Sequence, residues 1–94
     1  MILLVIKFEF GGREYSALAR VKEKDKRTEY AITVMNGELE QLLYGNHVII
    51  EEDGEIRLDL SPDTEVGRLK CIIAKALNVY IRHAAENKYP QSLN

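Results

Sequence analysis

The chain has 94 residues, of which 46% are hydrophobic and 30% charged, and a net charge of -2. This length suits a single domain with a modest core, and the composition is that of a folded protein rather than a disordered one. The slight negative charge gives no general attraction to nucleic acid or to an anionic membrane. With no Trp and two Phe, the chain can hardly form an aromatic platform that stacks bases.

The chain has one cysteine, Cys71, which excludes an intrachain disulfide and any zinc site built from several cysteines. The apolar segment MILLVI at the N-terminus is too short for a signal peptide, and it runs directly into alternating residues. No segment approaches the run of about 20 apolar residues that a membrane helix needs. We therefore expect a cytoplasmic protein with no membrane partner.

Residues 2–10 alternate apolar and polar side chains, which predicts a half-buried strand. The glycines at 11–12 favour a tight two-residue hairpin into a second strand over residues 13–23. This loop places Phe8 opposite Tyr15, and the other apolar partners then fall on the same face.

A second turn, centred on residues 25–26, leads to a third strand over residues 28–35. This register places Val21 opposite Tyr30 and again keeps one face apolar. The first 35 residues are therefore expected to form three antiparallel strands.

The segment VMNGELEQLLYGNHVII, residues 34–50, breaks the alternation. Asn36 is a good N-cap and Gly45 a good residue to end a helix, which predicts a short helix over residues 37–44. Two turns are not stable alone, so the apolar residues at helical spacing must pack against something else. These residues are Leu39, Leu42 and Leu43.

Residues 47–60 are predicted to form a second hairpin. A three-residue loop over residues 52–54 is preferred to a two-residue loop, because it puts the apolar residues of both strands on one face. That face would carry Val48, Ile50, Ile56, Leu58 and Leu60.

The last predicted element is a long amphipathic helix over residues 62–86, with Ser61 as N-cap and Pro62 in the first helical position. Residues 87–94 carry no periodicity and are expected to form a flexible tail. The apolar stripe of the helix consists of Val66, Leu69, Ile72, Ile73, Ala76, Leu77, Tyr80 and Ala84.

The predicted fold is therefore α+β, with the order β-β-β-short α-β-β-α in one domain over residues 1–86. It has a five-stranded antiparallel sheet, and the long helix packs on one of its faces. In length, hairpin order and the insertion MNGELEQLLYGN, the chain resembles small uncharacterised bacterial domains built from a β-meander and a C-terminal helix. This resemblance implies a fold but no active-site residue.

Few side chains suggest chemistry. Neither His47 nor His83 has a metal ligand or nucleophile placed beside it by the sequence, and Cys71 lies too far into the long helix for the dipole to activate it. The acidic run over residues 51–55 does not match the spacing of a calcium loop. We expect no catalytic residue, cofactor or metal, and we favour a protein that is not an enzyme.

One surface stands out. The sheet face that the long helix does not cover carries Leu3, Val5, Leu18, Ala31, Thr33 and Met35, and such apolar patches often mark interfaces. Either the short helix folds over this face, or a partner covers it.

Three functions follow from these features, in order of preference. The first is an interaction module, homodimeric or with another protein partner, that uses Leu3, Val5, Leu18 and Met35, with Leu39, Leu42 and Leu43 from the short helix. The second is a small-ligand site or minimal enzyme with a cleft at Tyr44, Asn46 and His47. The third and least favoured is nucleic-acid binding through Arg20, Lys22, Lys24, Lys26 and Arg27.

Overall fold

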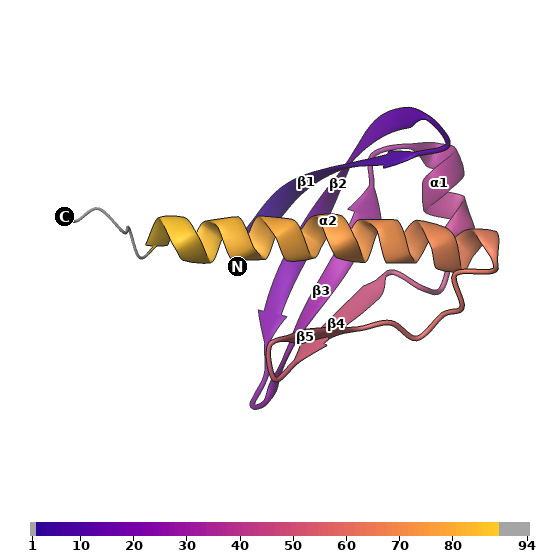
Figure 1. The fold of residues 1–94 in the computed structure, drawn as a ribbon. Helices are drawn as coiled ribbons and strands as arrows, with labels where there is room; N and C mark the ends of the chain where they lie inside the picture. The colour runs from indigo at the N-terminus through magenta and orange to yellow at the C-terminus, as the bar shows by residue number, and fades with distance from the viewer. Residues whose placement is uncertain (1, 89–94) are drawn as a thin grey trace.

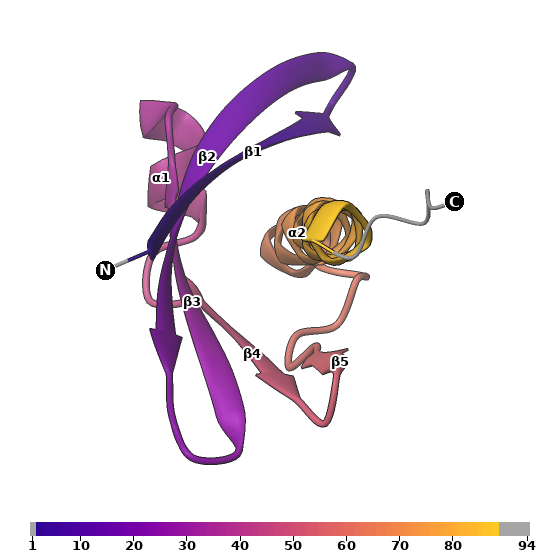
Figure 2. The same cartoon turned by 90° about the vertical axis from the view of Figure 1, so that its left-hand side faces the viewer.

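The computed structural model describes residues 2–88 and contains one five-stranded antiparallel sheet, with strands in chain order, curled around a long helix (Figures 1 and 2). The strands are β1 (Ile2–Phe10), β2 (Arg13–Glu23), β3 (Arg27–Val34), β4 (Val48–Glu52) and β5 (Glu55–Arg57). Helix α2 (Glu65–Lys88) lies in the concave face of the sheet, and the short helix α1 (Gly37–Leu42) follows β3. The predicted α+β fold is confirmed.

The first two hairpins have the predicted registers. Phe8 pairs with Tyr15 across β1 and β2, and Val21 pairs with Tyr30 across β2 and β3. Gly11 takes the positive φ that the two-residue turn requires, as does the glycine after it. The apolar side chains of these strands face α2 and form most of the core, which includes Ile6, Phe8, Ala17, Ala19, Ile32 and Val34.

The predicted three-residue loop of the last hairpin is wrong. Asp53 and Gly54 have φ values of 54° and 80°, which make a two-residue turn with both residues in the left-handed region. Ile50 therefore pairs with Arg57, and the faces are shifted by one residue from the prediction.

The pairing of β4 with β3 shows why the shift is favourable. Ile49 pairs with Tyr30, whose side chain faces the core, so Ile49 becomes the buried residue of β4 and is 1% exposed. Val48 then points to the opposite face and is 44% exposed, and Leu58 is 51% exposed. The three consecutive apolar residues at the start of β4 allow either alternation, and contact with β3 decides between them.

Helix α2 begins later than predicted, and Ser61 is not its cap. Thr64 caps it, since its Oγ1 accepts a hydrogen bond from the backbone N–H of Gly67 at 3.0 Å. Residues 61–64 form a turn before the helix, in which the carbonyl of Ser61 accepts from the Thr64 hydroxyl at 3.0 Å. The helix continues to Lys88, past the predicted end at 86, and the remainder of the predicted tail, residues 89–94, lies outside the described residues.

Helix α1 has the predicted N-cap, because the Asn36 side chain accepts a hydrogen bond from the backbone N–H of Leu39 at 3.0 Å. The helix is shorter than predicted and ends at Leu42, and Gly45 adopts a positive φ in the turn that follows. Leu39 and Leu43 are 8% and 1% exposed and belong to the main core.

Candidate interaction surface

The sheet face turned away from α2 carries apolar side chains that the described residues leave open to solvent. Leu3 and Val5 are each 55% exposed, Met35 is 60% exposed, and Leu18 and Ala31 are half-buried. The corrected register of β4 adds Val48 to this face, a residue that the sequence analysis had placed in the core. We call these six residues the outer-face patch: Leu3, Val5, Leu18, Ala31, Met35 and Val48.

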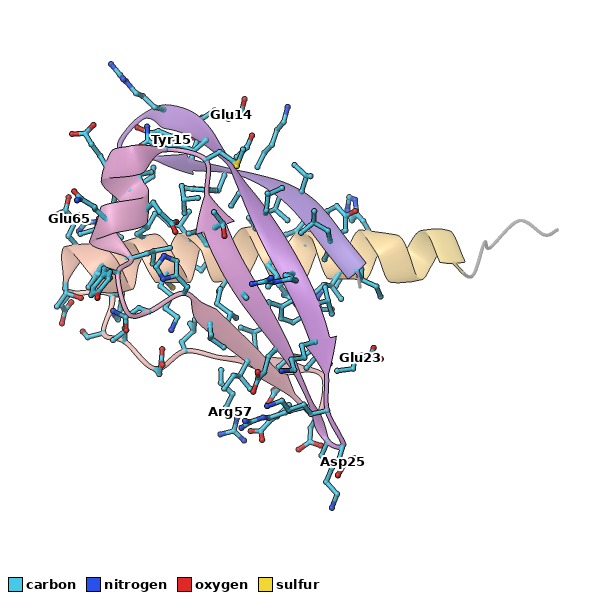
Figure 3. All side chains as sticks on the ribbon, turned by 180° about the vertical axis from the view of Figure 1, so that it is seen from behind. Glu14, Tyr15, Glu23, Asp25, Arg57 and Glu65 are labelled. Carbon is cyan, nitrogen blue, oxygen red and sulfur yellow. The ribbon has the colours of Figure 1, made fainter. Side chains whose placement is uncertain are left out.

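The patch runs across the sheet from one strand to the next. Val5 pairs directly with Leu18 between β1 and β2, and Ala31 pairs with Val48 between β3 and β4. Figure 3 looks onto this face and shows Glu14, Glu23 and Arg57 at its margins. The face therefore has apolar side chains across four strands, with Arg20 among them, and further charged residues at its margins.

Helix α1 does not cover this patch. Leu39 and Leu43 point into the core, and Leu42 is half-buried against it. The prediction that Leu39 and Leu43 could contact a partner is therefore wrong, because almost none of either side chain is exposed. The helical spacing of the leucines indicated a common face but could not indicate which side of the sheet that face would meet.

Arg20 lies in the middle of the outer face and was not recognised there from the sequence. It contributes to two shallow hollows, one of about 410 Å³ toward β4 and one of about 260 Å³ toward β1. Ala31 also lines both, and among the described residues no carboxylate forms an ion pair with Arg20. The sequence did contain a signal for this position, because Arg20 lies two residues after Leu18 on β2 and its side chain must therefore be on the same face of the sheet. Arginine within an apolar surface is a frequent anchor in protein interfaces.

The basic hairpin between β2 and β3 is partly neutralised. Lys24 and Arg27 both pair with Glu29, at 3.2 and 2.9 Å. The hydrogen bond from Lys24, with the charges of both cations, lowers the pKa of the Glu29 carboxyl below its ordinary value. Two of the five cations that might have met nucleic acid are thus already engaged with a carboxylate.

Within residues 2–88, Tyr44, Asn46 and His47 lie in the segment before β4 rather than around a defined hollow. Tyr44 is 84% exposed, and Asn46 donates from its side chain to the Tyr44 carbonyl at 3.3 Å. His47 Nε2 lies 2.9 Å from Glu40 Oε2, although the contact is not aligned as a hydrogen bond and Nε2 is otherwise unpartnered. The hollows beside β1, beside β5, around Arg20 and at the hairpin tips are lined by other side chains.

Two buried polar side chains have partners that explain their burial. Tyr30 donates its phenolic hydrogen to Glu51 at 2.7 Å, and burial together with this carboxylate raises the pKa of Tyr30 far above its ordinary value. Lys70 is 4% exposed and donates to Asp59 at 2.9 Å, which lowers the pKa of the Asp59 carboxyl. Both pairs tie separate segments together, and the sequence pattern had placed Lys70 outside the buried stripe of α2.

Another hollow lies beside β1, between this strand and α2. It measures about 560 Å³, and its lining includes Val5, Lys7, Val79, Tyr80 and His83. A further hollow of about 400 Å³ lies between β5 and α2, and its lining combines Ile56, Leu58 and Ala74 with the polar residues Glu55, Lys75, Asn78 and Arg82.

Within residues 2–88, no three His, Cys, Asp or Glu side chains come together as metal ligands would, and Cys71 is half-buried. None of the helices described has both the length and the apolar character needed to span a bilayer. Comparison with protein-family models, curated proteins and solved structures finds no match to this chain.

Proposed function

We propose that this chain is a non-enzymatic protein-interaction module that associates with a second copy of itself through the outer-face patch. The observation that carries the proposal is the exposure of Leu3, Val5, Met35 and Val48 on one side of a sheet whose other side packs against α2. Single exposed apolar residues are common on proteins, but a set that continues across four strands is not.

The energetics favour covering this face. Burying a Leu, Val or Met side chain that is now exposed contributes roughly 1.5 to 3 kcal/mol when the burial is complete. The half-exposed members of the patch would each gain a fraction of this, and part of the gain is lost to the entropy of association. The apolar face of one copy can meet the same face of a second copy around a twofold axis, so one surface is enough to form a closed pair.

The test replaces Leu18, at the centre of the patch, with Asp. A carboxylate buried between two largely apolar faces loses its hydration, so Leu18→Asp is expected to reduce the molar mass in solution compared with the wild type. Tyr44→Asp is the matched control, since it also places a carboxylate at an exposed aromatic or apolar position but lies outside the patch. Light scattering over a concentration series would show the difference, and an unchanged mass for Leu18→Asp would count against the proposal.

A further inference from the structure

Strand β1 leaves one side of its backbone unpaired. It is nine residues long, lies first in the sheet and, within residues 2–88, pairs only with β2. A strand edge of this length presents a row of N–H and C=O groups that can pair with another chain.

The hydrogen-bond pattern shows which residues of β1 point to the free side. The N–H of Met35 donates to the carbonyl of Ser16 at 2.9 Å, and the N–H of Lys24 donates to that of Arg27 at 2.8 Å. Even-numbered residues of β2 therefore bond to β3, and in an antiparallel sheet its odd-numbered residues must bond to β1.

The partners of those odd-numbered residues are even-numbered residues of β1, such as Ile6 opposite Ala17. The backbone groups of the odd-numbered residues of β1 consequently point away from β2. None of the hydrogen bonds formed by the described residues reaches them. These free residues are Leu3, Val5, Lys7 and Glu9.

A second observation concerns the flank of α2 beside the same edge. Val79 and Tyr80 are 54% and 40% exposed, although they lie on a helix whose other apolar residues are largely buried. With Val5 and Ile6 they line the hollow of about 560 Å³ next to β1. The C-terminal part of α2 also continues past the sheet at this end (Figure 1).

We propose that β1 pairs antiparallel with β1 of a second copy, around a twofold axis at Ile6. All nine residues of each strand then overlap, with Val5 of one copy opposite Lys7 of the other, and Leu3 opposite Glu9. The core-facing pairs are Leu4 with Phe8 and Ile2 with Phe10, and every free N–H and C=O of the edge finds a partner.

Two factors favour this register of the two β1 strands: the charges that it places opposite each other and the number of residues that overlap. Moving the axis by one residue to Lys7 would set the two lysines directly opposite each other, which is unfavourable. In the register centred on Ile6 no like charges are directly opposite. A peptide could fill the strand edge alone, whereas a second copy also brings its own α2 to cover Val79 and Tyr80.

This contact is separate from the outer-face contact proposed above, and either can hold without the other. Both are isologous. With their twofold axes crossing at right angles, they generate a closed assembly of four copies in which two edge-paired sheets stack by their outer faces. The expected molar mass of the wild type is then four times the 10.8 kDa of the chain.

The test replaces Lys7 with Pro and, as a control, with Thr. The N–H of Lys7 points to the free edge, so proline there leaves the pairing of β1 with β2 intact and removes a donor only from the contact between copies. Lys7→Thr removes the same charge but keeps the N–H. We expect half the wild-type mass for Lys7→Pro, the wild-type mass for Lys7→Thr, and a monomer when Lys7→Pro is combined with Leu18→Asp.

The outcomes separate the two contacts. An unchanged mass for Lys7→Pro overturns the edge contact and leaves the outer-face contact standing, whereas an unchanged mass for Leu18→Asp does the reverse. A monomeric wild type overturns both. If Lys7→Pro fails to fold, amide exchange of the wild type decides. The edge contact requires the Val5 and Lys7 amides to be protected at high concentration and to exchange on dilution, and fast exchange at every concentration overturns it.

Discussion

Glu40 completes the end of β3 by accepting a hydrogen bond from the backbone N–H of Val34 through Oε1, at 2.8 Å. The N–H of Val34 points toward β4, but β4 begins only at Val48 and does not extend far enough to pair with it. The second carboxylate oxygen of Glu40 lies 2.9 Å from His47 Nε2. One side chain of α1 thus connects the end of β3 with the residue before β4.

Replacing Glu40 with Ala is expected to lower the free energy of unfolding by about 1–3 kcal/mol, because the part-buried N–H of Val34 loses its acceptor. Glu40→Gln keeps a carbonyl oxygen in reach and should lose less. Urea denaturation of the two variants measures the difference. If both retain the stability of the wild type, the link between α1 and β3 contributes nothing.

Gly67→Ala should destabilise the protein by at least about 2 kcal/mol, despite the higher helix propensity of alanine. A Cβ at this position would clash with the backbone carbonyl oxygen of Ser61, so the turn before α2 would have to move. Gly37 in α1 is the control, because a Cβ there meets nothing within 4 Å. Thermal unfolding should show a loss for Gly67→Ala and a gain of up to about 1 kcal/mol for Gly37→Ala. Equal effects would contradict the close approach of Ser61.

Acid should weaken the attachment of the segment before α2. The pKa of Asp59 is lowered in the folded protein by the hydrogen bond from Lys70, so the unfolded chain takes up its proton first as the pH falls. The stabilisation is present above the unfolded carboxyl pKa of about 4 and is lost below it. Asp59 is largely exposed, so the effect is modest. Asp59→Asn should reduce the acid dependence of the unfolding free energy between about pH 5 and 2. If the unfolding free energy of Asp59→Asn depends on pH as that of the wild type does, the pair of Asp59 and Lys70 does not contribute to acid stability.

Raising the pH is expected to lower the stability of the protein through Tyr30. Its pKa is raised in the folded state by burial and by Glu51, so the phenol remains protonated where the unfolded chain would ionise. Stability should be complete below the unfolded value of about 10 and fall above it. Tyr30→Phe should show less of this alkaline loss and, at neutral pH, cost about 0.5–1.5 kcal/mol for the missing hydrogen bond. Urea unfolding at neutral and alkaline pH measures the stability of both proteins. An equal loss of stability at alkaline pH in the wild type and in Tyr30→Phe would contradict the role of Tyr30.

The sequence was most informative where turn chemistry and alternation agree. Gly11 and the glycine after it determine a two-residue turn, and strict alternation on both sides admits one register. The register of the second hairpin could also be predicted, because the face of β2 that points to the core is already known from the first hairpin. The outer-face positions of Leu3, Val5, Leu18 and Met35 could be read in the same way.

The remaining features depend on tertiary contacts. Val48 and Ile49 are both apolar, so local pattern could not tell which faces the core, and pairing with Tyr30 decides it. Lys70 looks like a surface residue by its charge, yet its side chain is buried and its ammonium donates to Asp59. The free side of β1 could be derived only once the ladder of hydrogen bonds was known.

The central claim is that this chain associates with itself, and the molar mass of the purified wild type tests it most directly. Sedimentation equilibrium over a wide concentration range should give a multiple of 10.8 kDa that decreases on dilution. Four copies are expected when both contacts form, and two when only one does. A mass of 10.8 kDa at every concentration would contradict the account, because the outer-face patch and the β1 edge would then remain exposed to water.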